Sequence, residues 1–160
     1  MKKILLVDDQ PMLVDMLREF LSIEGYDVTT HTDGLTALRQ MLDVRPDLVV
    51  TDFSMPGMNG AALLTAMREN AYLGDTPVLV LSGRPEHEIS ETCDGYAAYL
   101  RKPAEPADVL AIIRRLTPAA DRQPHYPATP GAMPEERAEK LADAVGKTIG
   151  VPMAYSHQPL

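Results

Sequence analysis

Several residue types that define other classes of protein are scarce in this chain. One cysteine in 160 residues excludes an internal disulfide framework and predicts a reducing compartment. Tryptophan is absent and phenylalanine occurs only twice, so the core must be mainly aliphatic. No apolar run approaches the roughly 20 residues that cross a bilayer, and the run at residues 4–7 is too short for a signal peptide. We therefore expect a cytoplasmic protein with no membrane partner.

Positive charge is also scarce. Fifteen Lys and Arg residues face 23 Asp and Glu residues, which leaves a formal charge of −8. The chain shows neither a basic stripe nor a helix-turn-helix pattern, so we expect no nucleic-acid partner. The four histidines are scattered without metal-ligand spacing, and ordinary structural roles are expected for them.

Short apolar runs alternate with helical apolar patterns through the first three quarters of the chain. The expected strands cover residues 4–7, 26–31, 48–50, 78–81 and 97–100. Residues 13–21 carry the first helical stripe, in which Met16 is expected to be buried. Such alternation predicts an α/β domain with a doubly wound parallel sheet, covering residues 1–117. The polar segment 84–94 should form only a short helix, with Ile89 and Cys93 in the core.

The composition changes after residue 117. Five prolines punctuate residues 118–134, which predicts an extended linker. Residues 135–160 form the tail, in which residues 135–147 have the spacing of one short amphipathic helix. Such a helix is too short to be stable alone in water, so it must pack on another surface or else be disordered. If it is ordered, we expect it to pack on its own domain or on a second copy.

Polar and charged side chains follow four of the five expected strands. Asp8 and Asp9 follow the first, Asp52 the third, Ser82 the fourth and Lys102 the fifth. The carboxyl ends of parallel strands share one edge of a sheet, so these side chains should converge. Three crowded carboxylates favour a divalent cation, and all-oxygen ligands favour Mg²⁺. With Mg²⁺ and Lys102 to hold phosphate oxygens, and the Ser82 hydroxyl to donate to one, Asp52 can act as a nucleophile toward a phosphoryl group.

Each of these residues alone has an ordinary structural explanation: a solvated acid pair, a turn serine, or a lysine at the end of an element. Their joint placement at successive strand ends is what favours a site. Four segments carry a family resemblance, and they are Leu6–Asp9, Thr51–Gly60, Leu81–Gly83 and Tyr99–Pro103. Together they resemble the receiver domain of bacterial two-component response regulators, over residues 1–117.

The resemblance implies a flavodoxin-like (βα)5 fold with the strand order 2-1-3-4-5. It implies that Asp52 accepts a phosphoryl group from a sensor histidine kinase or a phosphotransfer protein, and that Lys102 pairs with the phosphate. Asp9, Asp52 and the backbone carbonyl of Ser54 would ligate Mg²⁺, with Asp8 acting through water. Ser82 and Tyr99 match the family's switch pair. The domain would then be a phosphoacceptor module and not an enzyme. It would act by phosphorylation-dependent binding to a downstream protein, or as a relay intermediate.

The sequence departs from the family in several places. The interval from Ser82 to Lys102 is shorter than usual, which shortens the fourth helix and puts output through that face in doubt. Gly83 replaces a more usual alanine, and Ser54 and Arg84 occupy positions that tune dephosphorylation in the family. A homodimer through the tail or the fourth-helix face is compatible with the pattern. Residues 12–14 are candidates for a kinase-docking patch.

Three other functions compete with a receiver that has no DNA-binding output domain. In the first alternative, the chain is the N-terminal part of a longer regulator. In the second it is a Mg²⁺-dependent phosphohydrolase with an aspartate nucleophile, although such enzymes tend to place a second acid where this chain has Ser54. In the third it binds a flavodoxin-type cofactor, which the acidic site and the lack of a glycine-rich phosphate loop oppose.

Overall fold

The computed structural model describes residues 1–118, in which five strands alternate with five helices. The elements are, in chain order, β1 (Lys3–Val7), α1 (Pro11–Ile23), β2 (Asp27–His31), α2 (Gly34–Val44), β3 (Leu48–Asp52), α3 (Gly60–Glu69), β4 (Val78–Ser82), α4 (Glu86–Thr92), β5 (Ala98–Arg101) and α5 (Pro106–Leu116). The strands form one parallel sheet in the order β2-β1-β3-β4-β5. This architecture confirms the expected flavodoxin-like fold, including its strand order.

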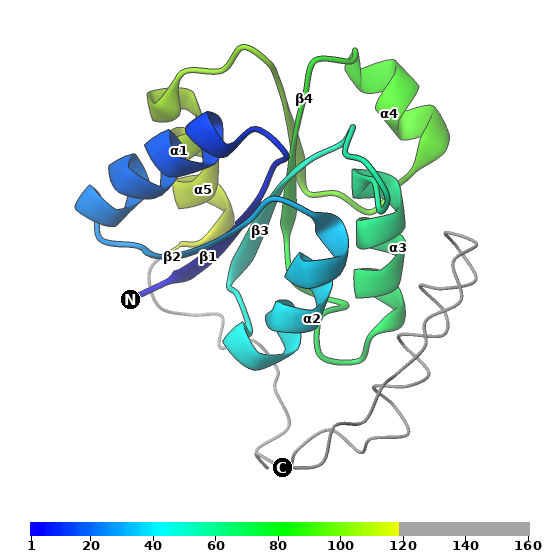
Figure 1. Cartoon of the computed structure of the whole chain (residues 1–160), viewed down its shortest axis with the longest axis horizontal. Helices are drawn as coiled ribbons and strands as arrows, with labels where there is room; N and C mark the ends of the chain where they lie inside the picture. The colour runs from blue at the N-terminus through cyan, green and yellow to red at the C-terminus, as the bar shows by residue number, and fades with distance from the viewer. Residues whose placement is uncertain (119–160) are drawn as a thin grey trace. The chain divides into compact units, whose positions relative to one another are not determined.

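The helices cover both faces of the sheet. Figure 1 shows α1 and α5 on one face and α2, α3 and α4 on the other. The chain leaves β1 toward one edge of the sheet and leaves β3 toward the other, although these two strands are neighbours. Loops at their carboxyl ends therefore diverge, and it is at such a point that sheets of this kind bind ligands.

The central strands owe their position to continuous apolar sequence. In β3 all five residues from Leu48 to Asp52 are buried, and β4 is buried along its whole length. The outer strand β2 is only partly buried. Fully covered strands read as unbroken aliphatic runs, because helices exclude water from both faces. A carboxylate at the end of β3 is thus held by one of the most buried segments of the domain.

Local sequence signals define where the helices begin. The Asp33 carboxylate accepts a hydrogen bond from the Thr36 N–H at 2.8 Å, and the Asn59 side chain accepts one from the Ala62 N–H at 2.9 Å. These side chains satisfy backbone donors that the first helical turn leaves free. α1 and α5 each begin with a proline, whose fixed φ suits the first helical position.

α4 is short and polar, as expected. It spans seven residues, and Ile89 is its only buried side chain. Two glutamates lie in its first turn, where negative charge is favoured by the helix dipole, and no side chain caps it. The helix is thus attached to the domain mainly through one isoleucine.

Two expectations about the core were wrong. Met16 is 44% exposed, because α1 contacts the sheet through the narrower stripe Val14, Leu17 and Leu21. Cys93 is not a core residue, since it follows the last turn of α4 in an extended conformation and is only half-buried. Both errors came from assigning apolar residues to a helical face without knowing how wide that face is.

The predicted linker and tail lie outside the described residues, except for Pro118 at the boundary. The helix expected at 135–147 and a homodimer through the tail therefore stay predictions. Within the described part of the chain, no helix combines the length and apolar character that spanning a membrane requires.

Candidate functional site

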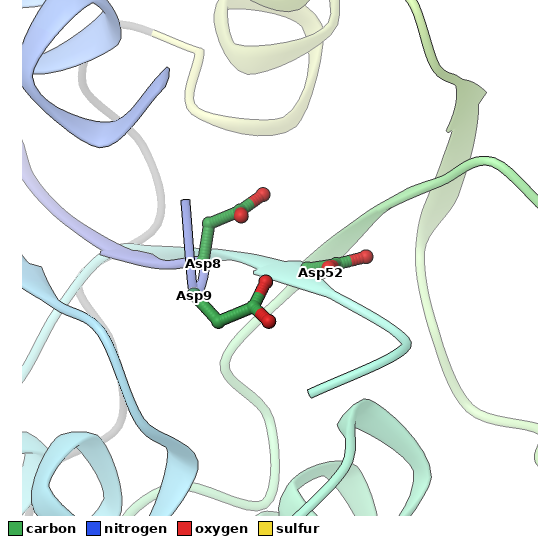
Figure 2. A group of neighbouring side chains, drawn as sticks. All are labelled: Asp8, Asp9 and Asp52. Atoms are coloured by element: carbon green, nitrogen blue, oxygen red, sulfur yellow. The ribbon is translucent and has the colours of Figure 1, made fainter. Parts of the chain in front are cut away.

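Three carboxylates meet at the carboxyl edge of the sheet. Asp8 and Asp9 follow β1, and Asp52 ends the neighbouring strand β3 (Figure 2). Each offers an oxygen atom within 4.8 Å of the other two. Asp8 and Asp52 are 5% and 7% exposed, whereas Asp9 is exposed to solvent. The structure therefore brings together the three acids that the sequence predicted would converge.

Lys102 reaches this cluster from the end of β5. Its backbone N–H donates to the Ser82 carbonyl at 2.8 Å, which holds the residue beside the end of β4. Its ammonium lies 2.5 Å from Asp8 Oδ2 and 3.5 Å from Asp52 Oδ2. One cation thus contacts both buried carboxylates, and it offsets part of their mutual repulsion.

Burial is the main influence on Asp52. It raises the pKa of the Asp52 carboxyl, because water no longer stabilises the charged form. The ammonium of Lys102 opposes this shift, the charge of Asp8 adds to it, and backbone hydrogen bonds from Ser54 and Phe53 oppose it. The Ser54 N–H lies 3.4 Å from Asp52 Oδ1. A bound divalent cation would favour the charged form further.

The acids suit a small divalent cation. Opposite ligands of an octahedral Mg²⁺ lie about 4.2 Å apart, because each metal–oxygen bond is about 2.1 Å long. The 4.8 Å limit on the carboxylate oxygens is close to that span, so a small closure or an intervening water would complete the geometry. Exposed Asp9 leaves an open side on which Mg²⁺ can keep the waters that it releases reluctantly. The donor set therefore fits Mg²⁺.

Ser82 and Tyr99 lie on adjacent strands and meet at the backbone of Arg84. The Ser82 hydroxyl accepts a hydrogen bond from the Arg84 N–H at 3.1 Å, and the Tyr99 hydroxyl donates to the Arg84 carbonyl at 2.5 Å. Ser82 is buried, whereas Tyr99 is half-buried. In this state the Ser82 hydroxyl is thus engaged with its own loop.

Two contacts around the site had not been expected from the sequence. The Arg84 guanidinium lies over the ring of Phe53, 6.0 Å from its centre, next to Asp52. Gly60 begins α3 directly against the end of β3, and a Cβ there would lie 2.7 Å from the Asp52 carbonyl oxygen. The sequence places Gly60 at the end of the segment Thr51–Gly60, but it does not show which backbone this glycine packs against.

The described contacts of Ser54 involve its N–H, so a metal-ligating role for its carbonyl stays a prediction. The fold and this cluster define a class: a doubly wound α/β domain with a cluster of acids at the point where its connections diverge. Residues 4–114 match the family model of the response regulator receiver domain. The chain belongs to the response regulator receiver family.

Known proteins that resemble the chain agree with this. It is 32% identical over 126 residues to the DNA-binding dual master transcriptional regulator RpaA of Synechocystis sp., covering 78% of this chain and 52% of RpaA. The chemotaxis response regulator CheY4 of Vibrio cholerae superposes with a TM-score of 0.69 at 31% identity, covering 73% of this chain and 99% of CheY4. The receiver domain of the sensor histidine kinase PA1611 from Pseudomonas aeruginosa, solved with a magnesium ion in its active-site cleft, has a TM-score of 0.66 at 28% identity and covers 72% of this chain and 96% of that one.

The chain spans about half the length of the curated relatives that it matches. Several of those relatives are named as DNA-binding regulators, among them MtrA of Mycolicibacterium smegmatis, which is 33% identical over 115 residues, 71% of this chain and 49% of MtrA. The expectation of no nucleic-acid partner and no DNA-binding output finds no support among them. How the whole protein produces its output is therefore a separate question from the chemistry of the receiver domain.

Proposed function

We propose that Asp52 accepts a phosphoryl group from a phosphohistidine of a sensor histidine kinase or a phosphotransfer protein. The observation that carries this proposal is the position of one buried carboxylate, at the end of β3, between two further acids and the Lys102 ammonium. A nucleophile, a cation site and a fixed positive charge are the parts that phosphoryl transfer requires.

The transfer is balanced in electrons and charge. An Asp52 carboxylate oxygen attacks phosphorus, a P–O bond forms, and the P–N bond to the donor imidazole breaks with its electron pair left on nitrogen. Lys102 lies close enough to Asp52 for its ammonium to pair with the phosphoryl oxygens that arrive there. Asp9, Asp52 and the Ser54 carbonyl would hold Mg²⁺, with Asp8 acting through water, and the ion would supply further neutralisation of phosphate charge.

Ser82 and Tyr99 are the proposed readout of phosphorylation. When the Ser82 hydroxyl turns to donate to a phosphoryl oxygen, it gives up its hydrogen bond with the Arg84 N–H. The Arg84 carbonyl also holds the Tyr99 hydroxyl, so movement of this loop changes the position of the tyrosine ring. The surface formed by α4 and β5 would then differ between the two states and bind a downstream protein.

The donor protein is proposed to dock on the start of α1, beside the acids. Met12 is 88% exposed there, while Leu13 is half-buried. Val14 is 4% exposed and packs in the core, so it does not belong to the patch that was expected at residues 12–14. An exposed methionine next to a reactive site provides an adaptable apolar contact for a partner helix.

A longer regulator that begins with this receiver remains an alternative for the whole protein. It is favoured by relatives of about twice the matched length. A Mg²⁺-dependent phosphohydrolase is the alternative of a different class. Its second acid is missing, because the residue two places after Asp52 is Ser54, whose N–H hydrogen-bonds to the Asp52 carboxylate.

The decisive experiment is incubation with acetyl phosphate and Mg²⁺, followed by intact-protein mass spectrometry. One phosphoryl group per chain is expected, and Asp52→Asn should abolish it. The matched control is Asp47→Asn, which changes an aspartate that bonds the backbone at the opposite edge of the sheet. Repeated turnover of phosphomonoesters by the wild type, or labelling that survives Asp52→Asn, would contradict the proposal.

A further inference from the structure

One side chain outside the site contacts an unusual number of backbone carbonyls. The Arg68 guanidinium, near the end of α3, donates through Nη1 to the carbonyls of Gly74 and Thr76, both at 2.9 Å. It donates through Nη2 and Nε to the carbonyl of Gly95, at 2.6 and 3.2 Å. The planar fork of arginine allows one group to reach both segments at once.

These carbonyls belong to the segments that start two strands. Thr76 lies just before β4, and Gly95 lies just before β5. The same ends are joined by the Ala97 N–H, which donates to the Val78 carbonyl at 2.8 Å. Arg68 therefore fastens the starting ends of β4 and β5 to each other and to α3.

α3 connects this point to Asp52. The helix begins at Gly60, whose N–H donates to the Phe53 carbonyl at 2.9 Å, and it runs back along the sheet to Arg68 (Figure 1). Eight residues of helix span about 12 Å. Because Gly60 also packs on the Asp52 backbone without space for a Cβ, the position of Arg68 is fixed relative to the phosphoacceptor.

The finishing ends of the same strands are held differently. There, the Arg84 loop is joined to Ser82 and Tyr99 by hydrogen bonds between neutral groups. Such bonds are weaker than those donated by a charged guanidinium. β5 itself rises about 10 Å from Ala98 to Arg101, at roughly 3.3 Å per residue. The two ends of β5 therefore differ in how firmly they are attached.

We propose that Arg68 is a positioning residue that holds the starting ends of β4 and β5 as a fixed pivot. The change that follows phosphorylation is then confined to residues 82–92 and 99–102, while residues 93–97 keep their place. This inference rests on the proposed function of Asp52. The proposal gives the shortened α4 a defined role. The loop from α4 to β5 is short enough to be held at Gly95 by the Arg68 guanidinium, and α4 moves between this fixed point and the acidic site.

The test compares backbone amide NMR shifts and hydrogen exchange in the full chain, with Mg²⁺ alone and with added beryllium fluoride as a phosphoryl mimic. In the wild type, shifts should change in 82–92 and 99–102 and stay constant in 93–97. Arg68→Met should raise exchange at the Ala97 amide and extend the beryllium fluoride response through 93–97. Arg114→Met, which removes an exposed guanidinium paired with Glu24, is the matched control and should do neither.

Arg68→Lys keeps the positive charge but lacks the planar guanidinium. The beryllium fluoride response should therefore also extend through residues 93–97 in this variant, but more weakly. Arg68→Lys replaces Arg68→Met in the test if Arg68→Met does not fold. A wild-type response in 93–97 as large as that in 99–102 would overturn the pivot, and so would unchanged exchange at Ala97 in both Arg68 variants. A wild type with no response at any amide would instead refute the phosphoacceptor function. The two failures are therefore distinguishable.

Discussion

The ammonium of Lys102 lies 2.5 Å from a carboxylate oxygen of Asp8, nearer than it lies to Asp52. The lysine and Asp8 are both largely buried. A pair of this kind stabilises the domain in the absence of a metal, because each charge would otherwise be left without compensation. Binding of a divalent cation at the same acids would compete for Asp8 and release the ammonium toward Asp52.

Replacing Lys102 with methionine should therefore weaken the domain and strengthen its cation site. Without Mg²⁺ we expect the free energy of unfolding to fall by about 1–3 kcal/mol, since two buried carboxylates lose a charged partner. The dissociation constant for Mg²⁺ should fall, because the competing ammonium is gone. Urea denaturation with and without Mg²⁺ measures both effects.

Lys2→Met is the control for that experiment. Lys2 is 3.5 Å from Asp47 but is 34% exposed, and exposed pairs contribute little, about 0–1 kcal/mol. A Lys102→Met variant that loses equal stability at saturating Mg²⁺ would show that the lysine acts through packing and not through charge.

Mg²⁺ should stabilise the folded domain through its acids. At 100 times the dissociation constant, a ligand specific for the folded state adds about 2.7 kcal/mol. Asp9→Asn should remove much of this gain and leave the metal-free stability within about 0.5 kcal/mol of wild type, because Asp9 is exposed. Thermal unfolding with Mg²⁺ and with a chelator measures both quantities.

The exposed acid Asp27, at the start of β2, supplies the control as Asp27→Asn. It should keep the full stabilisation by Mg²⁺. If Asp9→Asn also kept the full gain, Asp9 would not be a ligand, and the cation site would have to be built from Asp8 and Asp52 alone.

Gly60→Ala should destabilise the domain by about 1–3 kcal/mol, as overpacking of a tight contact does. A Cβ at this position would lie 2.7 Å from the Asp52 carbonyl oxygen and 2.9 Å from the Phe53 Cα, and neither backbone atom can move cheaply. Chemical denaturation gives the loss, and acetyl phosphate labelling shows whether Asp52 is displaced.

Gly83→Ala is the control for the stability loss expected of Gly60→Ala. A Cβ at Gly83 would meet nothing within 4 Å, and its φ is not in the left-handed region. We expect no loss, and a gain of about 0.4–1 kcal/mol, since alanine has fewer unfolded conformations. Equal losses for the two variants would mean that the close approach at Gly60 is not what limits substitution.

Much of this site could be predicted from the sequence, because the strand topology alone brings its residues together. Asp8, Asp52 and Lys102 are far apart in the chain, but each lies at or just after the end of a strand, and parallel strands end at one edge. Apolar runs of the right length were enough to find those strands. The same reasoning gave the short α4, since residues 84–94 hold too few apolar side chains for a longer helix.

Other features of the domain could not be predicted from the sequence. Arg68 carries no sequence signal, because its partners are backbone carbonyls, which every residue possesses. The buried width of α1 was overestimated at Met16, since periodicity shows which way a helix faces but not how deeply it sits. The contact between Gly60 and Asp52 depends on the distance between two backbones, which no residue type encodes.

His31 should make stability depend on pH. Its Nε2 atom is buried and has no hydrogen-bond partner among the described residues. Burial lowers the pKa of His31 from the ordinary value of 6.5, and the charge of Asp33 partly opposes this. Below pH 6.5 the unfolded chain therefore takes up a proton before the folded one does, and the free energy of unfolding falls as the pH falls. The fall ends once the pH is below the folded-state pKa.

A single group of this kind contributes a slope of at most about 1.4 kcal/mol per pH unit. His31→Gln should remove this part of the slope, and the exposed His87 provides the control as His87→Gln, which should keep it. Urea denaturation of all three proteins from about pH 7 to about pH 5 isolates the effect, because carboxylate titration is common to them. A slope that is the same in wild type and His31→Gln would show that the folded domain protonates His31 as readily as the unfolded chain does. Burial would then not be what sets the protonation of His31 in the folded domain.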